Sequence, residues 1–224
     1  MIREVNVKEI TENIKEMCIE ANYTLSPDMD KAMKKAAEEE KSELGTKILN
    51  QLQENLVIAD SEKIPICQDT GMAVVFVDIG QEIHFTGGQL EEAIHEGVRQ
   101  GYTEGYLRKS VVKDPIERVN TKDNTPAIIH YNIVPGEKIK ITVAPKGFGS
   151  ENMSRIFMLK PADGIEGVKN AILTAVKDAG PNACPPMVIG VGIGGTFEKS
   201  AILAKKALTR NLEEPSEIPY VREL

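Results

Sequence analysis

The chain has 224 residues, enough for one well-filled hydrophobic core or at most two small ones. A net charge of −7 and a pI near 5.2 argue against the basic surface that nucleic-acid binding requires. The N-terminus lacks the apolar core of a signal peptide, and no apolar run reaches the length of a membrane span. We therefore expect a cytoplasmic protein that binds neither nucleic acid nor membranes.

The first 60 residues are predicted to be helical. Apolar residues around Cys18 recur at helical spacing, which indicates one helix with a buried stripe. Ser26 followed by Pro27 is typical of a helix start, so a second helix is expected from Pro27 to about Lys41. Gly45 is expected to interrupt the chain before a third helix over residues 46–58.

The central part of the sequence alternates between strand and helix signals. Residues 72–79 are β-branched and almost continuously apolar, which predicts a strand buried on both faces. A helix is expected over residues 90–107, where glycine at every fourth position suits close packing against another element. Residues 110–126 are predicted to be irregular, and residues 127–134 and 137–144 to form a β-hairpin.

The C-terminal part begins with a glycine loop over residues 146–152. An amphipathic helix is expected over residues 164–179, a short strand over 187–191 and a last helix over 196–208. The fold class that follows is mixed α/β. We expect a single domain, residues 1–224, in which the helical segment 1–60 precedes an α/β core (64–210) made of a mixed sheet packed with helices.

Two of the three cysteines lie in turns beside proline, which stiffens the backbone where the sulfur is presented. Cys67 and Cys184 each adjoin a predicted strand, so their sulfurs could meet at the ends of neighbouring strands. Intracellular cysteines are usually small buried hydrophobic residues. The polar residues Gln68, Asp69 and Thr70 instead favour a functional turn, with Asp69 as the natural proton-transfer group or, alternatively, a turn-capping residue.

The segment Gly190–Gly195 has the spacing G-x-G-x-x-G, after a predicted strand and before a predicted helix. This spacing is typical of dinucleotide sites, but the expected ribose-binding acid would fall in the acidic tail at Glu213 or Glu214. An anion-binding helix N-terminus or simple tight packing therefore explains the segment better. The loop from Lys146 lacks the spacing of a nucleotide phosphate loop.

Arg108 follows the predicted helix 90–107 and could hold a carboxylate through two parallel hydrogen bonds, or could simply be a solvated helix end. The three histidines show no metal-ligand spacing, and we interpret them as structural: His84, His95 and His130.

Four motifs together resemble one family. They occur in the order Ile66-Cys-Gln-Asp-Thr-Gly71, Lys146-Gly-Phe-Gly-Ser-Glu-Asn-Met153, Ala183-Cys-Pro-Pro186 and Gly190-Val-Gly-Ile-Gly-Gly-Thr196. The chain resembles the α subunit, or N-terminal domain, of class I fumarases and L-tartrate dehydratases, from about residue 5 to its end.

The resemblance implies the α component of a [4Fe–4S] hydro-lyase that dehydrates a 2-hydroxy dicarboxylate, with malate to fumarate favoured and L-tartrate as the alternative. In such a site three cysteine thiolates hold the cluster, and the iron without a protein ligand activates the hydroxyl oxygen. Cys67 and Cys184 match two of the three ligands. Gln68 and Asp69 match catalytic and substrate-binding residues, and Arg108, Gly147 and Gly149 match further substrate-binding positions.

The family's third cluster cysteine lies downstream of the acidic tail, and Cys18 does not replace it because it belongs to a helical stripe. The resemblance also implies a β subunit, in a hetero-oligomer or dimer. We therefore expect the chain alone to be inactive and unable to hold a cluster stably. Two other classes stay open: a dinucleotide-binding oxidoreductase that uses Gly190–Gly195, and a scaffold subunit that only docks a partner.

Overall fold

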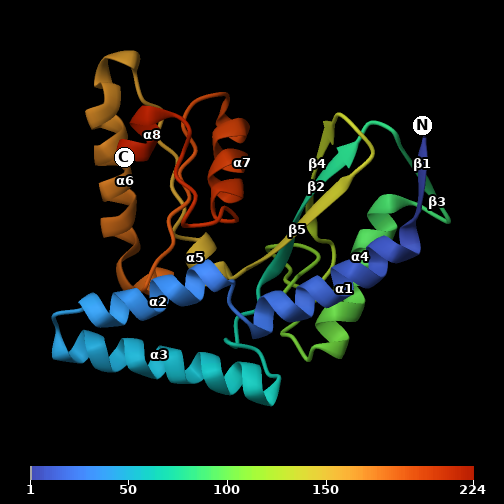
Figure 1. The fold of residues 1–224 in the computed structure, drawn as a ribbon, viewed down its shortest axis with the longest axis horizontal. Coiled ribbons are helices and arrows are strands. Elements are labelled where there is room, and N and C mark those ends of the chain that lie inside the picture. The colour runs from blue at the N-terminus through green and yellow to red at the C-terminus, as the bar shows by residue number, and fades with distance from the viewer. Residues whose placement is uncertain (1) are drawn as a thin grey trace. The chain divides into compact units, whose positions relative to one another are not determined.

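A computed structural model describes residues 2–224, and the fold is mixed α/β, as the sequence predicted (Figure 1). The chain forms two compact units, the first ending at Gly147 and the second beginning at Phe148. The elements of the first unit are β1 (Arg3–Asn6), α1 (Val7–Tyr23), α2 (Pro27–Glu39), α3 (Glu43–Glu62), β2 (Met72–Gly80), β3 (Ile83–Thr86), α4 (Leu90–Glu104), β4 (Ile128–Val134) and β5 (Ile139–Lys146).

The predicted helices of this unit are confirmed, and local capping explains where they begin. Asn6 caps α1 by accepting a hydrogen bond from the amide of Lys8 at 3.0 Å. α2 begins at Pro27, as predicted. α3 begins earlier than predicted, because Ser42 accepts a hydrogen bond from the amide of Gly45. Gly45 thus lies in the first turn of α3 instead of interrupting it.

β2 is the central strand of a three-stranded sheet with the order β4-β2-β5. It runs parallel to β4 and antiparallel to β5, and residues 73–77 are buried. The predicted hairpin between β4 and β5 is wrong, because β2 lies between them. The physical reason is that β2 is apolar along almost its whole length, so it is best accommodated with a strand on each edge and cover on each face.

A second, smaller sheet was not predicted. β1 and β3 pair in parallel, with Arg3 opposite Ile83 and Asn6 opposite Thr86. Both strands have only four residues, too few for an alternating pattern to distinguish them from a loop. This pairing ties the start of α1 to the segment that leads from β2 into α4.

The core of the first unit lies between the sheet and the pair α1 and α4, which run side by side (Figure 1). The two helices approach so closely that a β-carbon on Gly97 would lie 2.7 Å from the carbonyl oxygen of Thr11. A β-carbon on Gly101 would lie 2.8 Å from the β-carbon of Cys18. The expectation that the glycines of this helix mark close packing is therefore confirmed.

The second unit consists of helices and connecting segments. Its elements are α5 (Phe148–Glu151), η1 (Pro161–Asp163), α6 (Gly164–Ala179), η2 (Gly180–Ala183), α7 (Phe197–Ala207) and α8 (Pro219–Glu223). α6 and α7 confirm the helices predicted over 164–179 and 196–208. The strand predicted over residues 187–191 is wrong: these residues are assigned to no strand, and the described part of this unit offers no other strand with which they could pair.

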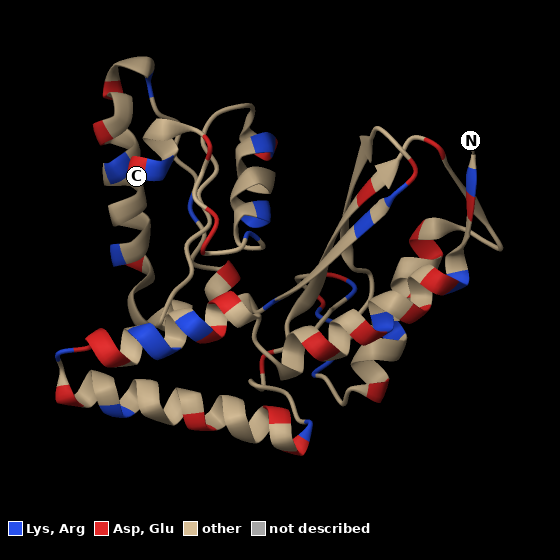
Figure 2. Ribbon diagram, viewed as in Figure 1, with Lys and Arg blue, Asp and Glu red and all other residues tan. Residues whose placement is uncertain are grey.

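Charged residues of both signs are interspersed along the helices of the described chain (Figure 2). β2 carries a single charged residue, Asp78, as expected of a buried central strand. None of the helices in the described residues is both long and apolar enough to span a membrane.

Gly101→Ala is expected to lower the free energy of unfolding by about 1–3 kcal/mol, because the added methyl group overpacks the contact with Cys18. This loss should exceed the gain in helix propensity from Gly to Ala, which is about 1 kcal/mol. Thr103→Ala, at an exposed position of the same helix, is the control and should change stability by no more than about 0.5 kcal/mol. Urea denaturation measures both; equal stability of the two variants would contradict the packing argument.

Candidate functional site

The turn that carries Cys67 lies between α3 and β2 and is anchored at its start by two helices. The amide of Ile66 donates to the carbonyl oxygen of Asn22 at the end of α1, at 2.8 Å. The side-chain amide of Asn55 in α3 donates to the carbonyl oxygen of Ile66 at 2.9 Å. The backbone before Cys67 is therefore held in place, and the side chain of Cys67 is exposed.

The end of the turn is held by Thr70, which is buried and faces the segment that follows α4. The hydroxyl of Thr70 accepts a hydrogen bond from the amide of Arg108 at 2.9 Å and donates to the carbonyl oxygen of Arg108 at 3.2 Å. The phenol of Tyr102 in α4 donates to the carbonyl oxygen of Thr70 at 2.8 Å. Burial raises the pKa of Tyr102, so its hydroxyl remains a donor at neutral pH.

Gly71 allows the turn to pass close to the end of β5. Its φ is +61°, and a β-carbon at this position would lie 2.0 Å from the carbonyl oxygen of Lys146, so glycine is required. The same approach brings Asp69 against Gly147: a β-carbon on Gly147 would lie 3.0 Å from a carboxylate oxygen of Asp69. Two of the predicted site residues are therefore neighbours, and Asp69 is half-buried.

A pocket of about 470 Å³ opens beside the turn, within the first unit. It brings together three residues predicted from the sequence, Cys67, Gln68 and Arg108. The remaining lining residues are Ile64, Pro65, Thr70 and Tyr106. An exposed arginine, a side-chain amide and a thiol thus line one largely apolar pocket. Such a pocket suits a small anion that binds beside a group held by the cysteine sulfur.

Tyr106 is a feature of this pocket that the sequence did not predict. Its side chain is 88% exposed, and its φ of +50° is unusual for a residue other than glycine. The chain turns sharply here, between the end of α4 and Arg108, and the aromatic ring becomes part of the pocket wall.

The sulfur of Cys67 lies within a local hydrogen-bonding arrangement. The amide of Asp69 donates to the sulfur at 3.4 Å, and the thiol donates to the side-chain oxygen of Gln68 at 3.5 Å. Amide hydrogen bonds to cysteine sulfur stabilise the thiolate and are a recurrent feature of iron–sulfur ligands. Of the three polar residues that follow Cys67, Gln68 therefore contacts the sulfur through its side chain and Asp69 through its backbone amide.

Cys184 and Gly149 belong to the second unit. Cys184 follows η2 with a left-handed φ of +56°, its amide donates to the carbonyl oxygen of Pro181 at 3.1 Å, and its side chain is exposed. Gly149, in α5, lies against η2, since a β-carbon there would be 3.7 Å from the carbonyl oxygen of Asn182. These two predicted site residues are therefore near one another along adjoining short helices.

Cys18 differs from the other two cysteines in every respect that governs reactivity. It is 0% exposed within the core between α1 and α4, and burial raises the pKa of its thiol to about 12. A neutral, enclosed thiol is a poor metal ligand.

Among the described residues, no group of three or more His, Cys, Asp or Glu side chains is arranged to hold a metal ion. Of the histidines, His130 stacks on Phe76 with the ring centroids 5.0 Å apart.

The glycine segment before α7 supports the tight-packing interpretation. A β-carbon on Gly190 would lie 2.1 Å from the carbonyl oxygen of Ala204, and one on Gly192 would lie 2.0 Å from that of Ser200. The glycines therefore let this segment lie directly on α7. A dinucleotide fingerprint also requires a preceding strand, and residues 187–191 do not form one.

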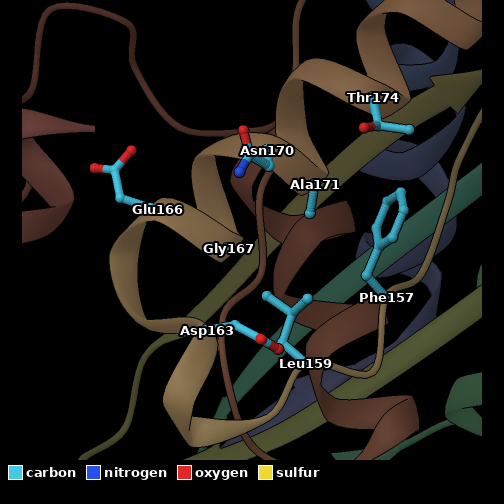
Figure 3. Close-up of a pocket in the computed structure, with 8 residues that line it drawn as sticks. All are labelled: Phe157, Leu159, Asp163, Glu166, Gly167, Asn170, Ala171 and Thr174. Carbon is cyan, nitrogen blue, oxygen red and sulfur yellow. The ribbon is translucent and has the colours of Figure 1, made fainter.

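A second hollow, of about 460 Å³, lies within the second unit beside α6 (Figure 3). Phe157 and Leu159 line it together with residues of α6, and none of the predicted site residues takes part. Both of its carboxylates have partners: Asp163 accepts a hydrogen bond from the amide of Lys160, and Glu166 pairs with Lys169. Of the two pockets, only the one beside the Cys67 turn is lined by predicted site residues.

The chain matches a known protein family and several named proteins. Residues 11–224 match the family described as fumarate hydratase (Fumerase), a family of hydro-lyases. The chain belongs to this family. It is 42% identical over 212 residues to a protein of Methanocaldococcus jannaschii named putative L(+)-tartrate dehydratase subunit alpha, with 92% of this chain and 74% of the relative covered.

Bacterial relatives carry the same name. The chain is 30% identical over 234 residues to the L(+)-tartrate dehydratase subunit alpha of Escherichia coli O157:H7, covering 100% of this chain and 76% of the relative. The corresponding protein of Shigella boydii is 29% identical over the same length. The resemblance to the α component of this family, stated from four motifs, is therefore confirmed.

Alkylation of the native chain by a small thiol reagent is expected to modify Cys67 and Cys184 and to leave Cys18 unmodified. The reason is that the first two thiols are exposed, whereas Cys18 is enclosed and its raised pKa keeps it protonated. Mass spectrometry after native labelling should show two additions, and a third should appear only after denaturation. Labelling of Cys18 in the folded chain would contradict this assignment.

Proposed function

We propose that the chain is the α component of a [4Fe–4S]-dependent hydro-lyase that removes water reversibly from a 2-hydroxy dicarboxylate. Support comes from membership of the family combined with one observation: Cys67, Gln68 and Arg108 line a single pocket. An anion-binding side chain and a candidate cluster ligand therefore lie within reach of one small substrate. Malate, with fumarate as its product, is the first candidate substrate, following the family's description.

Cys67 and Cys184 are the proposed cluster ligands in this chain. Both thiols are exposed in turns, and Cys67 already accepts an amide hydrogen bond, which suits a thiolate ligand. Cys18 is unsuitable because it is enclosed in the core. When bound, a cluster with one iron free of protein ligands supplies a Lewis acid for the hydroxyl group that leaves the substrate.

The other residues bind the substrate and move its proton. Arg108 lines the pocket, and a planar guanidinium can hold a substrate carboxylate through two parallel hydrogen bonds. Gln68 orients the substrate by hydrogen bonding. Asp69 is the proposed group that takes the proton from C3 of the substrate in dehydration and returns it in hydration. Gly147 lies against the Asp69 carboxylate, and the proposed role of Gly147 and Gly149 is to line the substrate site with their backbone.

L-Tartrate is the second candidate substrate, because the curated relatives are named L(+)-tartrate dehydratases. Malate and tartrate both carry a hydroxyl group and a removable proton on adjacent carbons between two carboxylates. Tartrate has one more hydroxyl, so the two substrates share the binding role of Arg108 and differ only at the reacting carbons.

A β subunit is the proposed partner, in a hetero-oligomer, since the relatives are named subunit alpha. The functional test therefore uses the protein with the family's downstream segment that carries the third cluster cysteine, produced together with a β subunit of this family and assembled without oxygen. The complex should contain iron and sulfide, convert L-malate to fumarate and lose this activity in air. Parallel assays with L-tartrate, followed by oxaloacetate formation, distinguish the two substrates. An iron-loaded complex that is inactive on both would overturn the proposal.

Cys67→Ser and Cys184→Ser should each abolish turnover and reduce the bound iron of the assembled complex, because one thiolate ligand is lost. Cys18→Ser is the matched control. It should leave the iron content of the folded protein unchanged, although the buried hydroxyl lowers thermal stability. Iron analysis and the visible absorption of the cluster measure the outcome. Full activity of the Cys67 and Cys184 variants would instead support a scaffold that only docks a partner.

Arg108→Lys should raise KM for the dicarboxylate about 10- to 100-fold, because a charged hydrogen bond is lost while the positive charge remains. Arg118→Lys is the control: this arginine is also exposed in the segment after α4 but does not line the pocket. Steady-state kinetics of the assembled complex give both values. An unchanged KM in Arg108→Lys would remove Arg108 from the substrate site.

A further inference from the structure

Asn124 is a fully buried polar residue in the irregular segment between α4 and β4. Its side-chain oxygen accepts hydrogen bonds from the amides of Ser110 at 2.7 Å and Val111 at 3.1 Å. Its side-chain nitrogen donates to the carbonyl oxygen of Gly71 at 3.0 Å. One amide group thus joins two stretches of backbone that are far apart in the sequence.

Both of these stretches carry residues of the proposed site. Gly71 ends the turn that presents Cys67, and Ser110 comes two residues after Arg108. A second link runs parallel to the first, since the hydroxyl of Thr70 exchanges two hydrogen bonds with the backbone of Arg108. The turn and the Arg108 segment, which form two sides of one pocket, are therefore connected at two neighbouring points.

The position of Asn124 is itself held by its neighbours. Asp123 accepts a hydrogen bond from Arg99 of α4 at 3.1 Å and further bonds from the amide and hydroxyl of Thr125. Burial alone would raise the pKa of Asp123, but these hydrogen bonds outweigh it and lower the pKa to about 2. Asn124 has a left-handed φ of +62°, which asparagine tolerates better than most residues.

We propose that Asn124 is a positioning residue that sets the spacing between the Cys67 turn and Arg108. The roles of Cys67 and Arg108 in this statement rest on the proposed function. All three hydrogen bonds of the Asn124 side chain end on backbone groups of the two site-bearing stretches, and this distinguishes Asn124 from a residue that merely fills the core. A displacement of about 1 Å between substrate-holding groups can cost about 100-fold in rate, so such a link acts on catalysis without touching substrate.

Two substitutions separate the two halves of this link. Asn124→Asp keeps an acceptor for the amides of Ser110 and Val111 but loses the donor to Gly71. Asn124→Gly removes all three bonds and still permits the positive φ. Asn13→Asp is the matched control, since the exposed Asn13 also donates to a backbone carbonyl, that of Glu9 at 2.7 Å, but within α1 and outside the pocket lining.

The first readout needs no activity. Hydrogen exchange of the folded chain should accelerate at residues 67–72 in both Asn124 variants, and at residues 110–111 only in Asn124→Gly. Alkylation of Cys67 should change in rate relative to Cys184, whereas Asn13→Asp should match the wild type in both measurements. Unchanged exchange and alkylation in both Asn124 variants would overturn the proposal.

The second readout is the kinetics of the assembled complex. Asn124→Asp should lower kcat/KM about 10- to 100-fold, as substitutions of residues that orient a site commonly do, with a raised KM. Partial unfolding would lower only the apparent kcat, so a fall in kcat at unchanged KM would contradict positioning. If the wild-type complex turns over no 2-hydroxy dicarboxylate, the proposed function fails, and the exchange and alkylation results still decide the role of Asn124.

Discussion

The close approach of α1 and α4 determines much of the geometry of the first unit. Gly97 and Gly101 let the backbones come together, and this contact places Tyr102 inside the core with 0% exposure. A hydroxyl buried in this way is costly unless it finds a partner. Tyr102 finds it in the carbonyl oxygen of Thr70, so a contact between helices also fixes one end of the Cys67 turn. One side of the pocket is thus held by a residue of the hydrophobic core.

The polar residues around the pocket extend this arrangement outward. Thr70 links the Cys67 turn to Arg108, and Asn124 binds Gly71, the last residue of that turn. Asp123, beside Asn124, pairs with Arg99 of α4. Each link ends on a backbone atom or on a charged partner. Gln68 and Arg108 line the pocket, while the side chains of other residues hold the backbone around it in place.

Much of the fold could be predicted because its signals are local. The apolar stripe around Cys18, the Ser26-Pro27 start and the amphipathic pattern of residues 164–179 each lie within one helix, and all three helices form. Strand partners are not local. The adjacent segments 127–134 and 137–144 suggested a hairpin, whereas the long apolar strand β2 lies between these two predicted partners. The apolar run 187–191 has no strand beside it in the described part of its unit, so it remains unpaired.

The same distinction between local and non-local signals applies to the residues of the site. The residues beside Cys67 are contiguous, and their polar character in an apolar setting marked them in the sequence. Arg108 emerged from the resemblance as a carboxylate-binding residue. Tyr102 and Asn124 left no such signal, because each donates to a backbone carbonyl, 32 and 53 positions away respectively, and a backbone carbonyl is the same at every residue.

The order β4-β2-β5 also has a consequence for how the chain folds. β2 pairs on both edges with strands whose residues come about 50–70 positions later, so its hydrogen bonds must wait for the closure of long loops. On the ribosome, β2 emerges well before either partner, and its apolar residues are exposed until residues 128–146 follow. Non-local pairing of this kind slows folding. The pocket beside β2 is therefore completed only after most of the first unit has been synthesised, while the backbone hydrogen bonds within α1, α2 and α3 are local.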